Sequence, residues 1–117
     1  KPLKGVYGNI DNNVIRNEFP LDYRFSCENI KVWITHIGGY PNRYSKRISE
    51  GLKSEKVDLF ICGHSHILKV INDKKHNLLH INPGAIGKHG FHNKRTMVRF
   101  EIDGKKIENL EIIEFNR

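Results

Sequence analysis

The chain has 117 residues, of which 38% are hydrophobic and 28% charged, so its length and composition suit one globular domain with a single core. It carries 20 Lys and Arg residues against 13 Asp and Glu, and the formal net charge of +7 favours anionic partners such as phosphate esters or nucleic acid. No apolar run approaches the ~18 residues of a membrane span, so we expect no membrane partner. Cys27 and Cys62 are too few for a disulfide framework, which favours reduced thiols and a cytoplasmic protein.

The first half of the chain is predicted to contain three strands and a helix. Residues 5–8 resemble the end of a short strand, and residues 24–27 and 31–35 two further strands. An amphipathic helix is predicted within 41–53, because apolar residues recur there every four positions, at Tyr44, Ile48 and Leu52.

The second half is predicted to consist of strands. Residues 57–62 form a mostly apolar run, as expected for a strand covered on both faces. Two pairs of strands follow, 68–71 with 78–81 and 95–102 with 106–115. The last pair flanks Asp103-Gly104, which is the strongest hairpin signal in the chain. One helix among about seven strands predicts a strand-rich α/β domain without repeats or linkers.

Three of the strand-like segments end in glycine next to a side chain that can bind a metal. They are Gly8-Asn9, then Thr35-His36 before two glycines, and Gly63-His64-Ser65-His66. Open sheets place their sites in loops beyond the carboxyl ends of strands, so these segments are expected to converge. His64 and His66 are two residues apart, and in an extended or loop backbone both project to one side. Such a pair can serve two ions that lie ~3.5–4 Å apart.

Each of these residues also has a simpler interpretation. A His-x-His pair is common in surface loops, and His36 could bond to backbone at a strand end. Asn9 is a modest oxygen ligand, but Gly-Asn is also ordinary turn chemistry. Asp11 could orient a metal ligand or cap a following helical turn. His76 and His80 are interpreted as surface or packing residues.

Four blocks in chain order resemble the later signature blocks of the calcineurin-like metallophosphoesterases. They are Gly8-Asn9-Ile10-Asp11, Trp33-Ile34-Thr35-His36, Cys62-Gly63-His64-Ser65-His66 and Asn82-Pro83-Gly84. The last is typical of the small YfcE-type branch, and the resemblance covers nearly the whole chain. It implies a β-sandwich flanked by helices. It also implies a metal-dependent phosphoester hydrolase, in first place a phosphodiesterase, that uses two divalent ions and a bridging hydroxide on a small-molecule phosphoester. Mn, Fe or Zn would suit the ligands, with Mn favoured.

The resemblance also implies a role for individual residues. It gives Asn9, His36 and His64 to one metal and His66 to the other. The residues expected to support the ligands or shape the loops are Asp11, Asn82 and Gly84. Three residues after the Asn-Pro-Gly loop could contact a substrate phosphate, although a solvated basic loop explains them as well; they are Lys88, His89 and Arg95.

The sequence departs from the family pattern in three places. The family's Asp-x-His and Gly-Asp blocks have no match before Asn9, so residues 1–117 are expected to be the C-terminal portion of a single metallophosphoesterase domain, poorly active by itself. Ile10 stands where related phosphatases carry a histidine that is a candidate general acid, which favours diesters or aryl esters with good leaving groups. Ile37 replaces the usual glycine after His36, so the loop is expected to leave the strand one residue later.

Two other functions stay open. A retromer subunit that resembles this family acts chiefly as a protein-binding scaffold, but all the matching blocks here keep their ligand side chains, which favours an enzyme. A nucleic-acid-binding fragment is suggested by charge alone. A homo-oligomer is compatible with either function.

Overall fold

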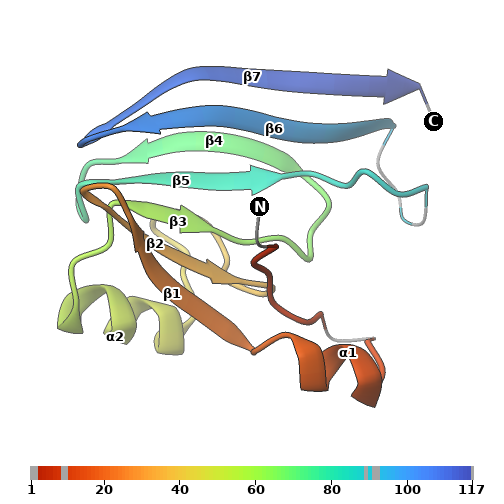
Figure 1. Ribbon diagram of the computed structural model, residues 1–117, viewed down its shortest axis with the longest axis horizontal. Coiled ribbons are helices and arrows are strands. Elements are labelled where there is room, and N and C mark those ends of the chain that lie inside the picture. Colours follow the sequence, from red (N-terminus) through yellow and green to blue (C-terminus); the bar gives the residue numbers. More distant parts are fainter. Residues whose placement is uncertain (1–2, 9–10, 89, 91–92, 117) are drawn as a thin grey trace.

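The computed structural model describes residues 3–8, 11–88, 90 and 93–116 (Figure 1). The described elements are α1 (Asn13–Glu18), β1 (Asp22–Cys27), β2 (Ile30–Thr35), α2 (Lys46–Ser54), β3 (Leu59–Ile61), β4 (Leu68–Asp73), β5 (Leu78–Pro83), β6 (Lys94–Asp103) and β7 (Lys106–Asn116). The predicted strand-rich α/β class is confirmed.

Five of the strands form one mixed sheet in the order β1-β2-β3-β5-β4. Its three central strands, β2, β3 and β5, run parallel to one another, whereas β1 and β4 are antiparallel to their neighbours. The carboxyl ends of the three central strands therefore meet at one edge of the sheet. This edge positions the candidate site.

The two faces of this sheet carry different cores because successive side chains point to opposite faces. Trp33 and Phe60 pair edge to face and pack with Ile48 of α2. On the other face, Val32 and Leu59 belong to the cluster that includes apolar side chains of β6 and β7. Figure 1 shows α2 on one side of the sheet and the β6–β7 hairpin on the other. The result is a β-sandwich with a helix on its outer face, as predicted.

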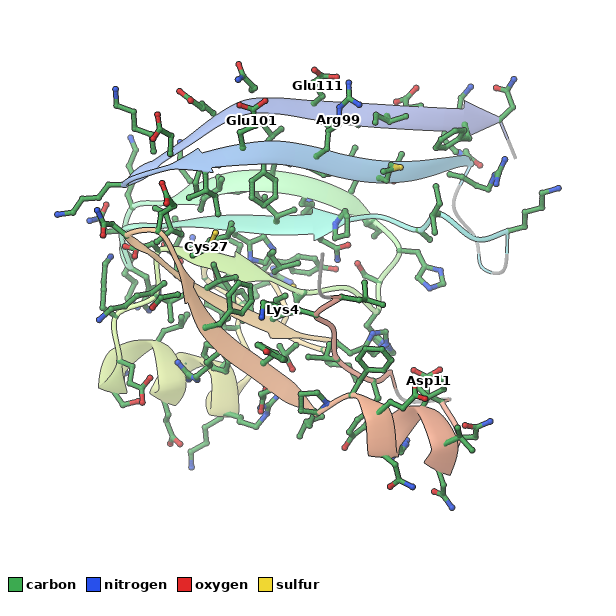
Figure 2. The ribbon with its side chains drawn as sticks, in the orientation of Figure 1. Lys4, Asp11, Cys27, Arg99, Glu101 and Glu111 are labelled. Carbon is green, nitrogen blue, oxygen red and sulfur yellow. The ribbon has the colours of Figure 1, made fainter. Side chains whose placement is uncertain are left out.

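The β6–β7 hairpin turns at the predicted position. Asp103 pairs with Lys106, and Gly104 adopts a φ of 62°, which favours glycine. The Gly104 N–H donates to the carboxylate of Glu28 at 3.0 Å, and this bond ties the hairpin to the β1–β2 turn. The outward face of the hairpin is charged, with Arg99 and Glu111 paired at 2.7 Å (Figure 2).

A polar network lies inside the helix-facing core. The fully buried His80 ring accepts or donates a hydrogen bond at 3.3 Å from Nδ1 to the Tyr44 hydroxyl. The buried Asp73 carboxylate bonds to His76 Nδ1 at 2.8 Å. Burial lowers the pKa of His80, and the nearby Asp73 charge only partly opposes this. His76 and His80 are thus packing residues, which agrees with their sequence interpretation.

The structure corrects three expectations about the elements. Residues 5–8 form no strand, and the N–H of Tyr7 donates to the Pro20 carbonyl instead. Helix α1 was not predicted, because it is six residues long and buries no side chain that would give an apolar period. Helix α2 begins at Lys46 rather than near residue 41, because Asn42 adopts a φ of 71° and interrupts a helical backbone.

Two further findings concern the whole described chain. Neither α1 nor α2 has the length and apolar character that a bilayer crossing requires. Both cysteines are free thiols, Cys27 partly exposed and Cys62 buried, as the sequence predicted.

Candidate metal centre and adjoining pocket

The candidate metal ligands lie just beyond the carboxyl ends of the central parallel strands. His36 directly follows β2, and the loop from Gly63 to His66 follows β3 after Cys62. The Gly63 N–H donates to the His36 carbonyl at 2.8 Å, so these two loops continue the sheet pairing by one step before they diverge. The two predicted histidine segments therefore start from adjacent points of the fold.

The imidazoles of His36 and His64 touch. The Nδ1 atom of His64 lies 3.3 Å from Nε2 of His36, and the rings meet edge to face at 83°. Burial lowers the pKa of His36, the charges of His64 and His66 lower it further, and the Asp11 carboxylate opposes these effects. His36 and His64 are thus in contact, Asp11 lies near them, and His66 acts on His36 through its charge. A depressed pKa keeps His36 neutral, which is the form that binds a metal.

The loop that carries His64 and His66 has an unusual backbone. His64 has a φ of 71° and His66 a φ of 63°, both in the left-handed region. This conformation costs a non-glycine residue about 1 kcal/mol, and it persists only where the surroundings enforce it. The sequence predicted a loop here but gave no sign of this conformation.

Asn82 of β5 holds this loop in place. Its side chain is 1% exposed, and its amide nitrogen donates to the Gly63 carbonyl at 3.2 Å and to the Ser65 hydroxyl at 3.0 Å. Its amide oxygen accepts from the N–H of Gly84 at 3.1 Å. The Ser65 hydroxyl in turn accepts from the N–H of Ile67 at 3.2 Å. Asn82 thus connects β5 to the histidine loop, and its predicted role in supporting metal ligands stays a prediction.

Gly84 occupies a position that no other residue fits without strain. Its φ is 76°, and an added Cβ would clash with the Thr96 hydroxyl. That hydroxyl donates to the Pro83 carbonyl at 2.8 Å. The close approach fixes the loop after β5 against β6.

Asp11 closes the loop that precedes α1 (Figure 2). Its carboxylate accepts from the Gly8 N–H at 2.7 Å, and a Cβ on Gly8 would be 3.4 Å from the His36 ring. The helix-cap interpretation of Asp11 was wrong, because Asn12 caps α1 by accepting from the Ile15 N–H at 3.1 Å. Asp11 instead holds the Gly8 backbone beside His36.

The remaining predicted site residues fall into two groups. Asn9 and His89 lie outside the described residues, as does Ile10. Lys88 is exposed, whereas Arg95 donates to the carbonyls of Asn116 at 3.2 Å and Ile86 at 3.4 Å. Arg95 therefore fastens the loop after β5 to the end of β7, and phosphate contacts by Lys88 and Arg95 stay predictions.

A pocket of about 460 Å³ adjoins His36. Its walls include Tyr7, Leu21, Ile37 and Ser45, and two arginines complete the lining, Arg16 and Arg47. The sequence gave no functional role to these residues except Ile37, whose departure from the family pattern was noted. The signal that could have found Tyr7 is its place directly before Gly8-Asn9.

The described residues contain no group of three or more His, Cys, Asp and Glu side chains arranged to hold a metal ion. Asn9, the fourth predicted ligand, is not among them. His36 and His64 are brought together, and the role of His36, His64 and His66 as metal ligands stays a prediction.

The fold is shared with several solved structures of low sequence identity. A Thermotoga maritima protein determined by NMR is 20% identical, with a TM-score of 0.67, over 96% of this chain and 65% of its own. A novel archaeal phosphodiesterase is 21% identical, with a TM-score of 0.67, over 94% of this chain and 67% of its own. Vps29 from Entamoeba histolytica complexed with Zn²⁺ is 16% identical, with a TM-score of 0.68, over 97% of this chain and 69% of its own. The chain thus spans about two thirds of the length of these proteins.

The sequence matches the model of the calcineurin-like phosphoesterase superfamily domain over residues 1–105. No functionally curated protein matches it. The family match agrees with the blocks around His36 and His64 and with the β-sandwich fold. This chain belongs to the calcineurin-like phosphoesterase superfamily.

Proposed function

We propose that the chain supplies the histidine side of a two-metal phosphodiesterase centre. His36, His64 and Asn9 would hold one ion, and His66 the other. The observation that carries this proposal is the 3.3 Å between the facing nitrogens of His36 and His64. Two nitrogens bound to one ion at ~2.0–2.1 Å lie about 2.9–3.4 Å apart, so the pair already has the spacing of two ligands on one metal.

The donor set fits a first-row divalent ion. Imidazole nitrogens and an amide oxygen suit Mn²⁺, Fe²⁺ or Zn²⁺, and we favour Mn²⁺. Ions held here would supply Lewis-acid activation of water and charge neutralisation at the phosphoryl group. A divalent ion is also present in the Zn²⁺ complex of Vps29, a protein that shares this fold.

Other features of the chain favour metal binding at this centre. Burial keeps the His36 ring neutral, so its nitrogen needs no proton loss before it binds a metal. Asn82 holds the Gly63 carbonyl and the Ser65 hydroxyl, and so restrains the loop that carries the neighbouring histidines. Residues behind metal ligands typically affect affinity or activity ~10–100-fold, so we assign Asn82 a positioning role.

The substrate is proposed to be a small-molecule phosphodiester. Because Ile10 offers no acid to protonate a departing alkoxide, esters with good leaving groups should react fastest. The high content of Lys and Arg favours approach of such anions.

The test uses the full-length protein prepared free of metal. Calorimetric titration with Mn²⁺ should show binding, and the protein should hydrolyse bis(p-nitrophenyl) phosphate only after Mn²⁺ is added. Hydrolysis that is independent of added metal and resistant to chelator would contradict the proposal. Tight Mn²⁺ binding without hydrolysis of this activated diester would instead favour a non-catalytic scaffold.

A further inference from the structure

The pocket beside His36 has the size and position of a substrate subsite. Its volume of about 460 Å³ falls within the range of ~300–1,000 Å³ that is usual for small-molecule sites. His36 is one of its walls, so a group seated in the pocket lies next to the proposed metal centre. A phosphodiester has one ester arm that leaves and one that stays, and this pocket is placed to take one of them.

The walls of the pocket are largely apolar. The side chains of Leu21 and Ile37 are 45% and 47% exposed, and both face this pocket together with Tyr7. Single exposed apolar residues are ordinary, but two that line one hollow together with the half-buried Tyr7 form a surface that a ligand can cover. Ile37 contributes to it from the position directly after His36.

The two arginines of the pocket have different surroundings. Both terminal nitrogens of Arg47 are engaged, one with the Asp22 carboxylate at 2.6 Å and the other with the Thr35 hydroxyl at 3.1 Å. The Asp22 charge therefore offsets that of Arg47. The guanidinium carbon of Arg16 lies 4.5 Å from the centre of the Tyr7 ring, in a cation–π stack. Flat stacked groups with apolar neighbours favour a flat, uncharged, aromatic ligand.

We propose that this pocket binds an aromatic ester arm of the substrate and makes the enzyme prefer aryl over alkyl phosphodiesters. This inference rests on the proposed phosphodiesterase activity. Leu21, Ile37 and the Tyr7–Arg16 stack are its specificity-determining residues.

The kinetic test compares two substrates in the full-length protein with Mn²⁺. Bis(p-nitrophenyl) phosphate and methyl p-nitrophenyl phosphate release the same phenolate and differ only in the arm that remains. Leu21→Ala should lower the ratio of the two kcat/KM values about 3–10-fold, mainly through a higher KM for the diaryl ester, because a contact with a remote arm contributes to binding. Ile112→Ala is the matched control, since Ile112 is an aliphatic side chain of the same 45% exposure on β7. An unchanged ratio in Leu21→Ala would overturn the inference while the phosphodiesterase proposal stands.

A binding experiment separates this inference from the proposed activity. Isoleucine methyl groups are labelled for NMR, and the protein is titrated with phenylphosphonate and, separately, with methylphosphonate. The phenyl ligand should shift the Ile37 methyl signal and leave Ile112 unchanged, whereas the methyl ligand should shift neither. If the wild type hydrolyses neither diester, the proposed function fails, and the Ile37 response alone decides whether the pocket takes an aromatic group. Equal responses of Ile37 to both ligands would refute the aromatic preference.

Discussion

The Nδ1 atom of His64 lies 3.3 Å from Nε2 of His36, although 28 positions separate the two residues in sequence. At this distance one nitrogen carries a proton and the other accepts it. For an ion to bind both nitrogens, that proton must sit on the other nitrogen of its own ring, so neither neutral ring loses a proton and the ion replaces a hydrogen bond with a net value of about 1 kcal/mol. The pair is thus close to its ligand geometry while still stabilising the metal-free fold.

The first prediction concerns His64→Ala in the full-length protein. Loss of a direct ligand should lower Mn²⁺ affinity and diesterase activity by at least the ~10–100-fold typical of changes behind the ligands. His76→Ala is the control, because His76 bonds to Asp73 and not to the metal centre. His76→Ala should lose stability because the buried Asp73 carboxylate loses one of its hydrogen-bond partners, so rates are compared per folded molecule. Equal rates for the two variants would speak against the metal centre.

The second prediction concerns Asn82→Asp. A carboxylate keeps an acceptor for the Gly84 N–H but has no donor for the Gly63 carbonyl or the Ser65 hydroxyl. The free energy of unfolding in urea should fall by at least about 2 kcal/mol, and amide exchange in residues 63–67 should accelerate. Asn72→Asp, at an exposed position of β4, is the control. It should change the free energy of unfolding by no more than ~0.5 kcal/mol and should leave amide exchange in residues 63–67 unchanged. A stable Asn82→Asp protein with slow exchange would remove Asn82 from its positioning role.

The third prediction concerns Gly84→Ala. The new Cβ meets the Thr96 hydroxyl, and alanine is strained at a φ of 76°, so the variant should lose about 2–4 kcal/mol of unfolding free energy. Gly87→Ala in the same loop meets nothing within 4 Å and should be nearly neutral. Thermal unfolding measured by circular dichroism distinguishes them. Equal melting temperatures for the two variants would show that position 84 does not require glycine.

The fourth prediction concerns pH. Because burial lowers the folded-state pKa of His80 below its ordinary value of 6.5, the unfolded chain takes up a proton more readily than the folded one. The associated stability is fully present above pH 6.5 and is lost as pH falls through the folded-state pKa. His36 acts with the same sign. His80→Gln should flatten the fall in unfolding free energy between pH 7.5 and 5.5, measured in urea. If the unfolding free energy of His80→Gln falls as steeply with pH as that of the wild type, the pH dependence does not come from His80.

The sequence predicted those parts of the fold that carry a strong local signal. Asp103-Gly104 identified the last hairpin, and the apolar run around Phe60 identified a strand covered on both faces. Helix α1 was not predicted because its N-cap residue, Asn12, is followed by no buried side chain. Val14, for example, is 66% exposed. A cap without an apolar period predicts a turn as readily as a helix.

The meeting of His36 and His64 was predictable, and the resemblance named Asn82 as a supporting residue, but the bonds that Asn82 makes were not predictable. His36 and the His64–His66 segment stand at strand ends, and strands that run parallel bring those ends together whatever their separation in sequence. The bonds from Asn82 to Gly63 and Ser65 depend on the register between β3 and β5, in which Ile61 lies opposite Ile81. No local pattern encodes that register. The pocket residues Arg16 and Leu21 likewise meet His36 only through tertiary packing.

The left-handed backbone at His64 and His66 lowers the stability of the fold at two positions whose side chains are the proposed metal ligands. Glycine or asparagine at either position would relieve about 1 kcal/mol of strain and would discard an imidazole. Selection for thermal stability alone should therefore favour glycine or asparagine at these two positions. Selection for metal binding should keep both histidines, although they make the fold less stable. A laboratory evolution experiment run under each pressure would expose this trade-off in the loop between β3 and β4.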